Sequence, residues 1–220
     1  MKTPTFRVVL FDFDYTLADS SEGAYECINF ALAKMGLAPV SAEAACRTIG
    51  LSLNETFLSL GDHHEPQRCA EFYRLFVERA DEVMSDLTVL YESVPAMVQT
   101  LREQGLRLGI VSTKYRRRIS QVLTREALSH GFELVIGGED VELHKPHPQG
   151  LFEAMQRLEC SPESVVYVGD SLVDAELAKR AGVPLIVVLS GTTPRSAFDD
   201  YSPLGILETV SELPQFLLDT

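Results

Sequence analysis

Short runs of β-branched and aromatic residues recur along the chain and predict buried strands. They span Arg7–Phe13, Leu106–Ser112, Glu133–Ile136, Val165–Val168 and Leu185–Val188. Between most of these runs, apolar residues recur at intervals of three and four, as they do on one face of an α-helix. Strands that alternate with helices are typical of a parallel sheet covered on both faces. The pattern therefore predicts an α/β core, Rossmann-like and doubly wound.

One stretch breaks this alternation. From about Ser20 to Leu87 the apolar residues have helical spacing, and no convincing strand is present. We therefore expect an all-helical cap domain inserted after the first strand. In this division, residues 1–18 and 88–220 form the α/β core and residues 19–87 form the cap. The alternative is that these helices pack on one face of the sheet.

Composition limits the partners of the protein. The chain has 220 residues and a formal net charge of −13. Nucleic acids and anionic membranes require a basic surface, so neither is an expected partner. A phosphate ligand would need local positive charge or a metal ion. Oligomeric state is left open, since a monomer and a cap-mediated dimer are equally compatible with the sequence.

Two features predict a cytoplasmic protein. The four cysteines are scattered, without the spacing of a metal site, which favours a reducing compartment. The apolar run Val8–Phe11 near the N-terminus is too short for a signal peptide or a membrane span.

The first predicted strand ends in two acidic residues, Asp12 and Asp14. Ligands of open α/β sheets bind beyond the carboxyl ends of the strands, which is where these residues fall. Carboxylates at positions i and i+2 of an extended chain point to the same side and repel each other. A cation or a shared proton would compensate this repulsion. Alternatively, one acid caps the next helix and the other is solvated.

Other strand ends also carry polar residues. Ser112 and Thr113 follow the second strand and supply hydroxyl groups where a helix begins, which suits an anion. Asp170 and Asp174 follow the fourth strand, after a glycine. Lys145 lies on a loop that two prolines stiffen. Taken singly, each has an ordinary explanation as a helix cap or a solvated side chain; together they suit a phosphoryl group and a hard cation.

In this order the motifs resemble those of the haloacid dehalogenase-like hydrolase superfamily, in particular its phosphoglycolate phosphatase-like branch with a helical cap. The motifs are Asp12-x-Asp14-x-Thr16, Ser112, Lys145 in Lys-Pro-His-Pro, and Gly169-Asp170-Ser171-x-x-Asp174. The resemblance covers nearly the whole chain. Each motif is weak alone, whereas the ordered set of four is specific.

The resemblance implies a mechanism that agrees with the chemistry of the residues. Asp12 would be the nucleophile and would form an aspartyl-phosphate. Asp14 would be the general acid and base. Mg²⁺ would be bound by the carboxylates of Asp12 and Asp170 and by the backbone carbonyl of Asp14.

The resemblance also implies how the phosphoryl group is bound. Ser112, with nearby amides and the hydroxyl of Thr113, would hydrogen-bond the phosphoryl oxygens. Lys145 would neutralise their charge and orient the nucleophile. Asp174 either tunes Lys145 or a metal-bound water, or acts as a helix N-terminal acid that the dipole favours.

Three positions depart from the family pattern or modify it. Tyr15 stands where this branch often has glycine, and its phenol could narrow the site or contact the substrate. Thr16 is interpreted as structural, with a hydrogen bond inside the turn. Ala24 stands where the sugar-phosphate mutases of the family carry histidine, which argues against mutase activity.

Three lesser features need an interpretation. The adjacent His63 and His64 are more easily explained as exposed loop residues than as metal ligands. The run Arg116–Arg118 fits a solvated helix face or the mouth of the cap. The segment Ile49–Leu53 resembles the part of the cap that selects the substrate.

The sequence therefore predicts a Mg²⁺-dependent phosphatase that acts on a small phosphorylated metabolite, such as phosphoglycolate. A sugar-phosphate mutase and a pyrophosphatase of the same superfamily are the alternatives within this fold. A receiver module of a signalling pathway, which also uses acids, a hydroxyl and a lysine at a sheet edge, is the alternative from another class.

Overall fold

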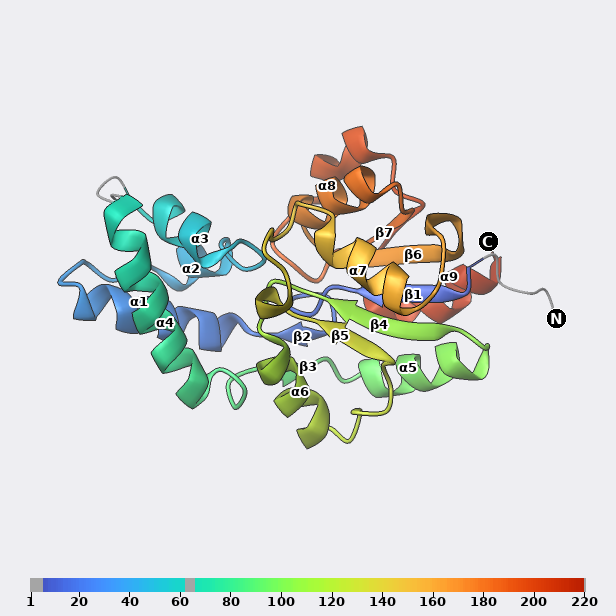
Figure 1. The fold of residues 1–220 in the computed structure, drawn as a ribbon, viewed down its shortest axis with the longest axis horizontal. Helices are drawn as coiled ribbons and strands as arrows, with labels where there is room; N and C mark the ends of the chain where they lie inside the picture. The colour runs from blue at the N-terminus through green and yellow to red at the C-terminus, as the bar shows by residue number, and fades with distance from the viewer. Residues whose placement is uncertain (1–5, 62–65, 220) are drawn as a thin grey trace.

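The structure is a computed structural model that describes residues 6–61 and 66–219. Its main part is a six-stranded parallel sheet with helices on both faces, and four helices, α1 to α4, form a separate insertion (Figure 1). The strands of the sheet are β1 (Val8–Phe11), β4 (Arg107–Val111), β5 (Leu134–Ile136), β6 (Val165–Gly169), β7 (Leu185–Val188) and β8 (Gly205–Leu207). The predicted α/β class with a helical insertion is confirmed.

The order of strands places β1 in the interior of the sheet, between β4 and β6. Across the sheet the order is β5-β4-β1-β6-β7-β8, and every neighbouring pair is parallel. The chain leaves β1 for β4 and β5 on one side, then returns to β6, β7 and β8 on the other. Ligand sites of open α/β sheets lie where the strand order reverses in this way.

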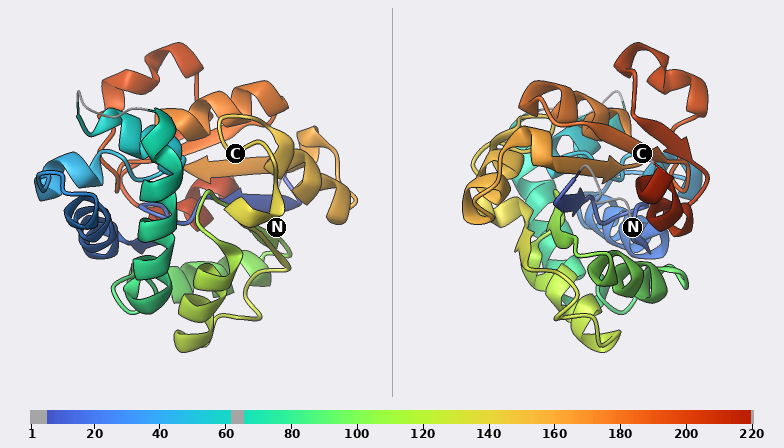
Figure 2. Two further views of the ribbon diagram at one scale, coloured as in Figure 1. Left: turned by 60° about the vertical axis from the view of Figure 1, so that its left-hand side comes forward. Right: turned by 90° about the vertical axis from the view of Figure 1, so that its right-hand side faces the viewer.

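Helices cover both faces of the sheet, as Figure 2 shows. One layer holds α5 (Val94–Glu103), α6 (Arg116–Arg125) and α9 (Leu213–Asp219), and the other holds α7 (Gln149–Arg157) and α8 (Leu172–Ala181). Side chains alternate along each strand, so Val9 and Phe11 pack in the cluster under the first layer, while Val8 and Leu10 pack under the second. Burial on both faces explains why the strands are continuous apolar runs.

The inserted helices have an apolar core of their own. They are α1 (Ser21–Lys34), α2 (Ala42–Cys46), α3 (Leu53–Ser59) and α4 (Cys69–Val83). Phe57 of α3 stacks on Phe72 of α4 with ring centroids 4.9 Å apart, and Cys27 and Ile28 of α1 complete the cluster. We call this unit the cap. Because its core is distinct from the two clusters of the sheet, the cap does not simply cover a face of the sheet.

Two short strands join the cap to the sheet. The chain leaves the sheet through β2 (Ala18–Asp19) and returns through β3 (Val89–Leu90), and these strands pair antiparallel. The sequence pattern missed both, because two residues are too few to show a period. The predicted domain bounds, with the cap at 19–87, fall beside this pair and stay a prediction.

Local expectations can be compared with the described residues. The central residues of each predicted strand are present as a strand, and Gly182 ends α8 in the left-handed conformation with φ of 68°. The strand β8 was not predicted, because Gly205–Leu207 is short and follows a proline. The predictions on His63 and His64 lie outside the described residues.

Candidate active site

The strand register brings the predicted acids to one edge of the sheet. Phe11 of β1 is level with Val168 of β6, and the amide of Asp12 donates to the carbonyl of Val168 over 2.8 Å. Asp12 and Asp170 therefore leave neighbouring parallel strands at nearly the same height. Ser112 follows β4 on the other side of β1, since Phe11 is also level with Ile110.

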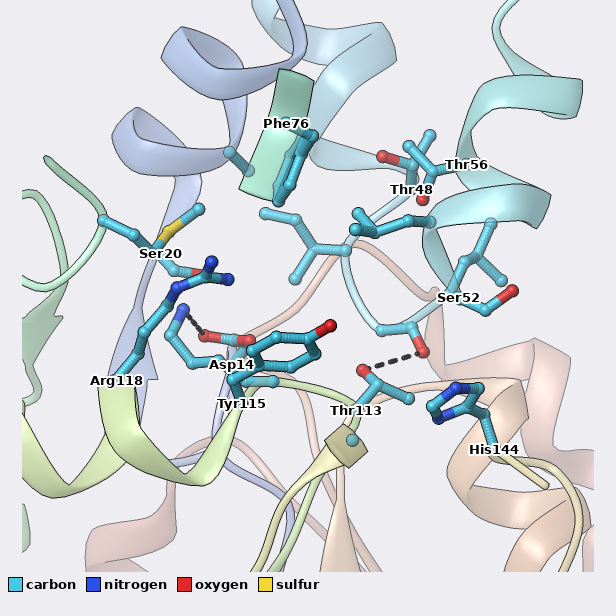
Figure 3. A pocket seen from close by; sticks show the side chains of 18 of the residues that line it. Asp14, Ser20, Thr48, Ser52, Thr56, Phe76, Thr113, Tyr115, Arg118 and His144 are labelled. Atoms are coloured by element: carbon cyan, nitrogen blue, oxygen red, sulfur yellow. Dashed lines mark hydrogen bonds and ion pairs between the residues drawn. The ribbon is translucent and has the colours of Figure 1, made fainter. Parts of the chain in front are cut away.

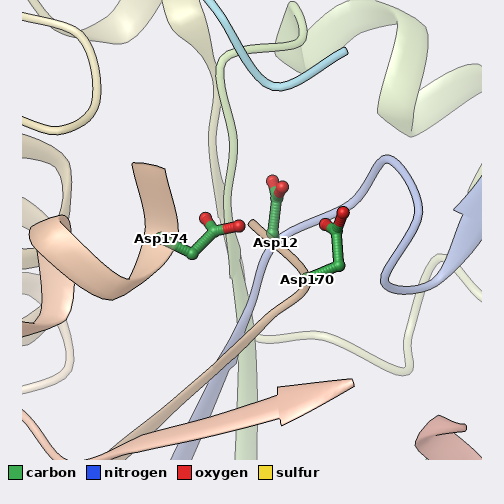
Figure 4. A group of neighbouring side chains, drawn as sticks. All are labelled: Asp12, Asp170 and Asp174. Atoms are coloured by element: carbon green, nitrogen blue, oxygen red, sulfur yellow. The ribbon is translucent and has the colours of Figure 1, made fainter. Parts of the chain in front are cut away.

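Asp12, Asp170 and Asp174 form a compact acidic group. One carboxylate oxygen from each lies within 4.8 Å of the other two, and all three side chains are buried. Figure 4 shows Asp12 between the other two, with Asp174 coming from α8. Asp12 and Asp170 are thus close enough to share one cation.

Burial raises the pKa values of these acids. The pKa of Asp12 rises to about 6, because burial and the charge of Asp174 outweigh the lowering by the Lys145 ammonium. The pKa of Asp170 is raised well above its usual value by burial, by Asp174 and by Asp12. Burial is the larger cause of both shifts, and the neighbouring carboxylates add to it, since like charges in a buried site disfavour ionisation. A bound cation would reverse this penalty.

Lys145 supplies the positive charge of the site. Its Nζ lies 2.8 Å from Oδ1 of Asp12 and 2.9 Å from Oδ1 of Asp174, and the side chain is 5% exposed. Burial acts to lower the pKa of Lys145, but the two carboxylates outweigh it and hold the pKa above its usual value. The loop position of Lys145 therefore carries a fixed ammonium group that touches the predicted nucleophile.

Asp174 has both of the roles that the sequence left open. Its Oδ2 accepts hydrogen bonds from the hydroxyl and amide of Ser171, so it forms a capping box at the start of α8. Its Oδ1 accepts from Lys145 and, over 3.1 Å, from the hydroxyl of Tyr167. Asp174 thus positions Lys145. The contribution of Tyr167 was not predicted, because a tyrosine within an apolar strand indicates only core packing.

Thr16 forms a hydrogen bond inside its turn, as expected, since its amide donates to the carbonyl of Phe13 over 3.3 Å, but its side chain bonds elsewhere. Its hydroxyl is fully buried and donates to Oδ1 of Asp170 over 3.3 Å. On the other side of Asp170, the chain passes so close at Gly191 that a Cβ atom there would lie 2.0 Å from Oδ2. Thr16 and Gly191 together fix the orientation of the Asp170 carboxylate.

Asp14 has a partner that the sequence did not indicate. Lys114 Nζ lies 2.9 Å from Oδ1 of Asp14, and both side chains are largely buried. Ser112 lies nearby with its Oγ accepting the amide of Lys114, and Thr113 donates its hydroxyl to the carbonyl of Gly50 in the cap over 3.4 Å. The predicted phosphate-binding residues thus lie at the edge of the sheet, with Thr113 turned toward the cap.

Tyr15 occupies a glycine-like backbone conformation. Its φ is 59°, a region that non-glycine residues rarely adopt and that glycine adopts readily. Burial and a hydrogen bond with Cys46 of the cap raise the pKa of the phenol. Tyr15 is not among the described residues that line the cavity of this site, so its side chain connects turn and cap.

A cavity of about 380 Å³ lies between the sheet edge and the cap (Figure 3). Asp14, Thr113 and Lys114 line it from the core. From the cap, its wall includes residues of the predicted selectivity segment, Ile49–Leu53, whose Gly50 has φ of +96°. Ala24, at the position of the mutase histidine, also lines it.

The run Arg116–Arg118 is only partly a solvated face. Arg116 is exposed and pairs with Asp140, but the Arg118 side chain is 5% exposed, lines the cavity and hydrogen-bonds Asp81 of the cap. Arg118 is one residue before Ile119 and four before Val122, on the buried stripe of α6. This spacing could have indicated from the sequence that Arg118 is buried. An arginine is ordinarily expected on a solvated face, however, so its burial was not predicted.

Fold and site together define a hydrolase of phosphatase type. The profile of the haloacid dehalogenase-like hydrolases matches residues 9–188. The chain belongs to that family. Membership of this family argues against the alternative interpretation as a signalling receiver module.

Individual relatives support the same assignment. The chain is 32% identical over 208 residues to the pyrophosphatase PpaX of Bacillus mycoides, covering 94% of each chain, and 30% identical over 213 residues to that of Bacillus anthracis, covering 97% of each. It superposes with a TM-score of 0.91 on a structure from Bacteroides fragilis described as a haloacid dehalogenase-like hydrolase, at 40% identity over 94% of this chain and 99% of that one. A predicted phosphoglycolate phosphatase of Haemophilus somnus shares the fold, with a TM-score of 0.86, 23% identity and coverage of 97% and 99%.

The acidic group is consistent with the Mg²⁺ site of the family. Oδ1 of Asp12 is a buried oxygen that, among the described residues, accepts no hydrogen bond of normal geometry, although Lys145 lies close as an ion pair. Asp174 already accepts from three side chains, whereas Asp12 and Asp170 keep free lone pairs. Carboxylate oxygens are the ligands that Mg²⁺ prefers. As for membranes, none of the helices within 6–61 and 66–219 has the length and apolar character that crossing one requires.

Proposed function

We propose that this protein is a Mg²⁺-dependent phosphatase that hydrolyses a small phosphate monoester through an aspartyl-phosphate on Asp12. The observation that carries the proposal is the contact of Asp12 with the Lys145 ammonium, 2.8 Å away, beside the carboxylate of Asp170. A nucleophilic carboxylate, a fixed cation and a second carboxylate are the groups that phosphoryl transfer requires.

In the first step, an oxygen of Asp12 attacks phosphorus while the bond from phosphorus to the ester oxygen breaks. Asp14 donates a proton to that oxygen, so that the leaving group departs as an alcohol. In the second step, Asp14 accepts a proton from water, which attacks phosphorus and releases phosphate and the Asp12 carboxylate. The position of Asp14 at the cavity supports this role, because the leaving group lies there.

Ser112, Thr113 and Lys145 bind the phosphoryl oxygens in this proposal. Lys145 neutralises charge on the transferring group and keeps Asp12 oriented, and Asp174 holds the ammonium in place. Ser112 lies at the end of β4 beside the start of a helix, where hydroxyl and amide donors suit an anion.

Asp12, Asp14 and Asp170 would hold the Mg²⁺ ion, the second of them through its backbone carbonyl. When bound, Mg²⁺ offsets the negative charge that gathers between the carboxylates and the phosphate. The raised pKa values of Asp12 and Asp170 support this assignment, because both acids are buried and share the single ammonium of Lys145 with Asp174.

We further propose the division into a catalytic core, 1–18 and 88–220, and a cap, 19–87. The separate apolar core of the cap supports it. A cytoplasmic location is supported by the four cysteines, all of which are free thiols. The partner of the enzyme is a small phosphorylated metabolite, with phosphoglycolate as one candidate.

Hydrolysis of inorganic pyrophosphate is the second candidate, since relatives of 30–32% identity are named pyrophosphatases. Mutase activity is disfavoured, because Ala24 provides no group that could transfer a proton in the cavity.

The test uses p-nitrophenyl phosphate and the purified full chain. We expect turnover with Mg²⁺, none with excess chelator, and a loss of at least about 10³-fold in kcat for Asp12→Asn. The exposed Asp199 provides the matched control, since Asp199→Asn makes the same chemical change on the segment Arg195–Tyr201, outside the acidic group. Full activity of Asp12→Asn would refute the mechanism.

A further inference from the structure

Tyr167 carries a hydroxyl group into a buried part of the molecule. On β6 its neighbours are the valines Val165, Val166 and Val168, and its ring is fully buried in the same apolar cluster as Val165. A phenylalanine ring would pack there in the same way. A hydroxyl group is costly to bury unless it is hydrogen-bonded, so the partners of this one indicate its role.

The two acceptors of this hydroxyl belong to different parts of the phosphoryl site. The hydroxyl lies 3.0 Å from the carbonyl oxygen of Val111, the last residue of β4, and 3.1 Å from Oδ1 of Asp174 on α8. A phenol has a single proton to donate, so the two acceptors share it. The hydroxyl therefore joins the end of β4, directly before Ser112, to the carboxylate that holds Lys145.

The ring of Tyr167 also contacts the ammonium of Lys145 directly. Nζ of Lys145 lies 5.3 Å from the ring centroid, within the range of a cation–π interaction. The same Nζ donates to Oδ1 of Asp174 over 2.9 Å, so this one oxygen accepts from both Lys145 and Tyr167. Tyr167 thus acts on Lys145 in two ways, through its ring and, by way of Asp174, through its hydroxyl.

The partners in this contact differ in rigidity. A lysine has a flexible four-carbon stem, and Lys145 comes from the loop before α7. Tyr167 lies on an interior strand, with β1 and β7 on either side, and its ring turns about only two bonds. The same strand approaches Asp174 from a second direction, since a Cβ atom at Gly169 would lie 2.8 Å from its Oδ2. Strand β6 is therefore the fixed support for the position of the ammonium.

In the proposed function, on which this inference rests, the ammonium of Lys145 must reach Asp12 and the phosphoryl oxygens together. Its Nζ lies 2.8 Å from Oδ1 of Asp12. Without the hydroxyl of Tyr167, Oδ1 of Asp174 would keep Lys145 as its single donor within the described residues. The carboxylate and the ammonium could then shift as a pair. A misplacement of about 1 Å can reduce the rate of an enzyme by about 10²-fold.

We propose that Tyr167 is a positioning residue for phosphoryl transfer. Its hydroxyl fixes Asp174, and through it Lys145, relative to the end of β4 where Ser112 lies. The cation and the hydroxyl group that bind the phosphoryl oxygens are thereby held in place by a fully buried residue that does not itself contact the substrate.

The test removes the hydroxyl alone, in the purified full chain with Mg²⁺. We expect Tyr167→Phe to lower kcat for p-nitrophenyl phosphate by at least about tenfold and to change KM by less than about threefold, because a misplaced ammonium acts chiefly in the transition state. Tyr201→Phe is the matched control, since Lys179 lies 5.5 Å from the centroid of the Tyr201 ring and both residues are outside the acidic group. This control should keep kcat within about twofold of wild type.

A double-mutant cycle with Lys145→Met separates positioning from a general structural effect. Since that variant has no ammonium to position, adding Tyr167→Phe to it should change kcat by less than about twofold, measured at high enzyme concentration. A folding defect would instead reduce kcat by the same factor in both backgrounds. Equal losses in the two backgrounds, or full activity of Tyr167→Phe, would overturn the proposal. Failure of the proposed function differs, since wild type would then not turn over p-nitrophenyl phosphate at all.

Discussion

The two walls of the cavity, one from the core and one from the cap, differ in the chemistry of their side chains. On the core wall, Asp14 and Lys114 are buried charges 2.9 Å apart, and at the same sheet edge Asp12 and Lys145 form a second buried pair, 2.8 Å apart. On the cap wall, hydroxyl groups and apolar side chains predominate, as with Thr48 and Ile49. Buried ion pairs need near-ideal geometry to offset their desolvation, so the core wall tolerates little change. An apolar wall is less demanding in geometry, and in the proposed function it is the wall that the leaving group would contact.

The largest expected effect comes from truncating Phe72, in the apolar core of the cap. Phe72→Ala should lower the free energy of unfolding of the cap by about 3–5 kcal/mol, because Phe72 is fully buried and stacks on Phe57. Hydrogen exchange of the amides measures it. Protection should fall in α1 and α4 while β1 and β6 keep theirs.

Phe72→Leu is the matched control and should cost less than half as much. If β1 and β6 lose protection together with α4 in Phe72→Ala, then cap and core unfold as one unit and the comparison fails.

The next effect concerns the core wall in the absence of metal. The pKa of Asp12 is about 6 in the folded protein, above the value of 3.8 for an unperturbed aspartate. Between these values the folded state binds more protons than the unfolded state, so stability falls as pH rises from about 4 to about 6. Asp12→Asn, which removes the charge, should therefore stabilise the chelator-treated protein at pH 7 by roughly 1–3 kcal/mol.

Thermal unfolding in chelator at pH 5 and pH 7 measures this effect. The variant should gain stability mainly at pH 7, and added Mg²⁺ should stabilise wild type more than the variant. A variant that is less stable than wild type at both pH values would show that the Asp12 charge is well compensated without metal.

A smaller effect tests the contact between the walls. Asp81 of the cap accepts from Arg117 and Arg118 of α6, whereas Glu26 pairs with Arg79 inside the cap. Asp81→Asn should lower kcat/KM by roughly fivefold, because partly exposed ion pairs contribute about 1 kcal/mol to closure of the cap. Glu26→Gln should leave kcat/KM within twofold and act on thermal stability alone. Equal losses of kcat/KM in both variants would contradict this assignment.

The smallest effect compares single backbone positions in core and cap. Ala127 follows α6 with φ of 56°, so Ala127→Gly should raise the free energy of unfolding by about 1 kcal/mol. Ala33 lies inside α1 of the cap and is exposed, so Ala33→Gly should lower it by about 1 kcal/mol. Denaturant titration checks both. Shifts of the same sign would show that strain at Ala127 does not decide its contribution.

Much of the core was predictable because its signals are local. Each strand is a continuous apolar run, and Asp12 and Asp170 directly follow such runs. Once the strands are taken as parallel neighbours, their ends must meet. The register then brings these acids together without information from elsewhere in the chain.

The ion pairs at the cavity were not predictable, because their partners are far apart in sequence. Lys114 and Asp14 are separated by 100 positions, and Arg118 and Asp81 by 37. In sequence, Lys114 reads as part of a helix start and Arg118 as one of three surface arginines. Likewise, the bond from Thr16 to Asp170 crosses 154 positions, so a turn was the simpler expectation.

The paired strands β2 and β3 are hydrogen-bonded to the turn that follows β1. Ala18 starts β2 and also bonds back to the turn after β1, since its amide donates to the carbonyl of Phe13 and its carbonyl accepts the amide of Tyr15. The β2–β3 pair and the turn that carries Asp14 are thus joined by hydrogen bonds at Ala18. In the proposed function, moving the cap away would therefore displace the turn that carries Asp14, so that entry of the ester and delivery of its proton would be coupled through Ala18.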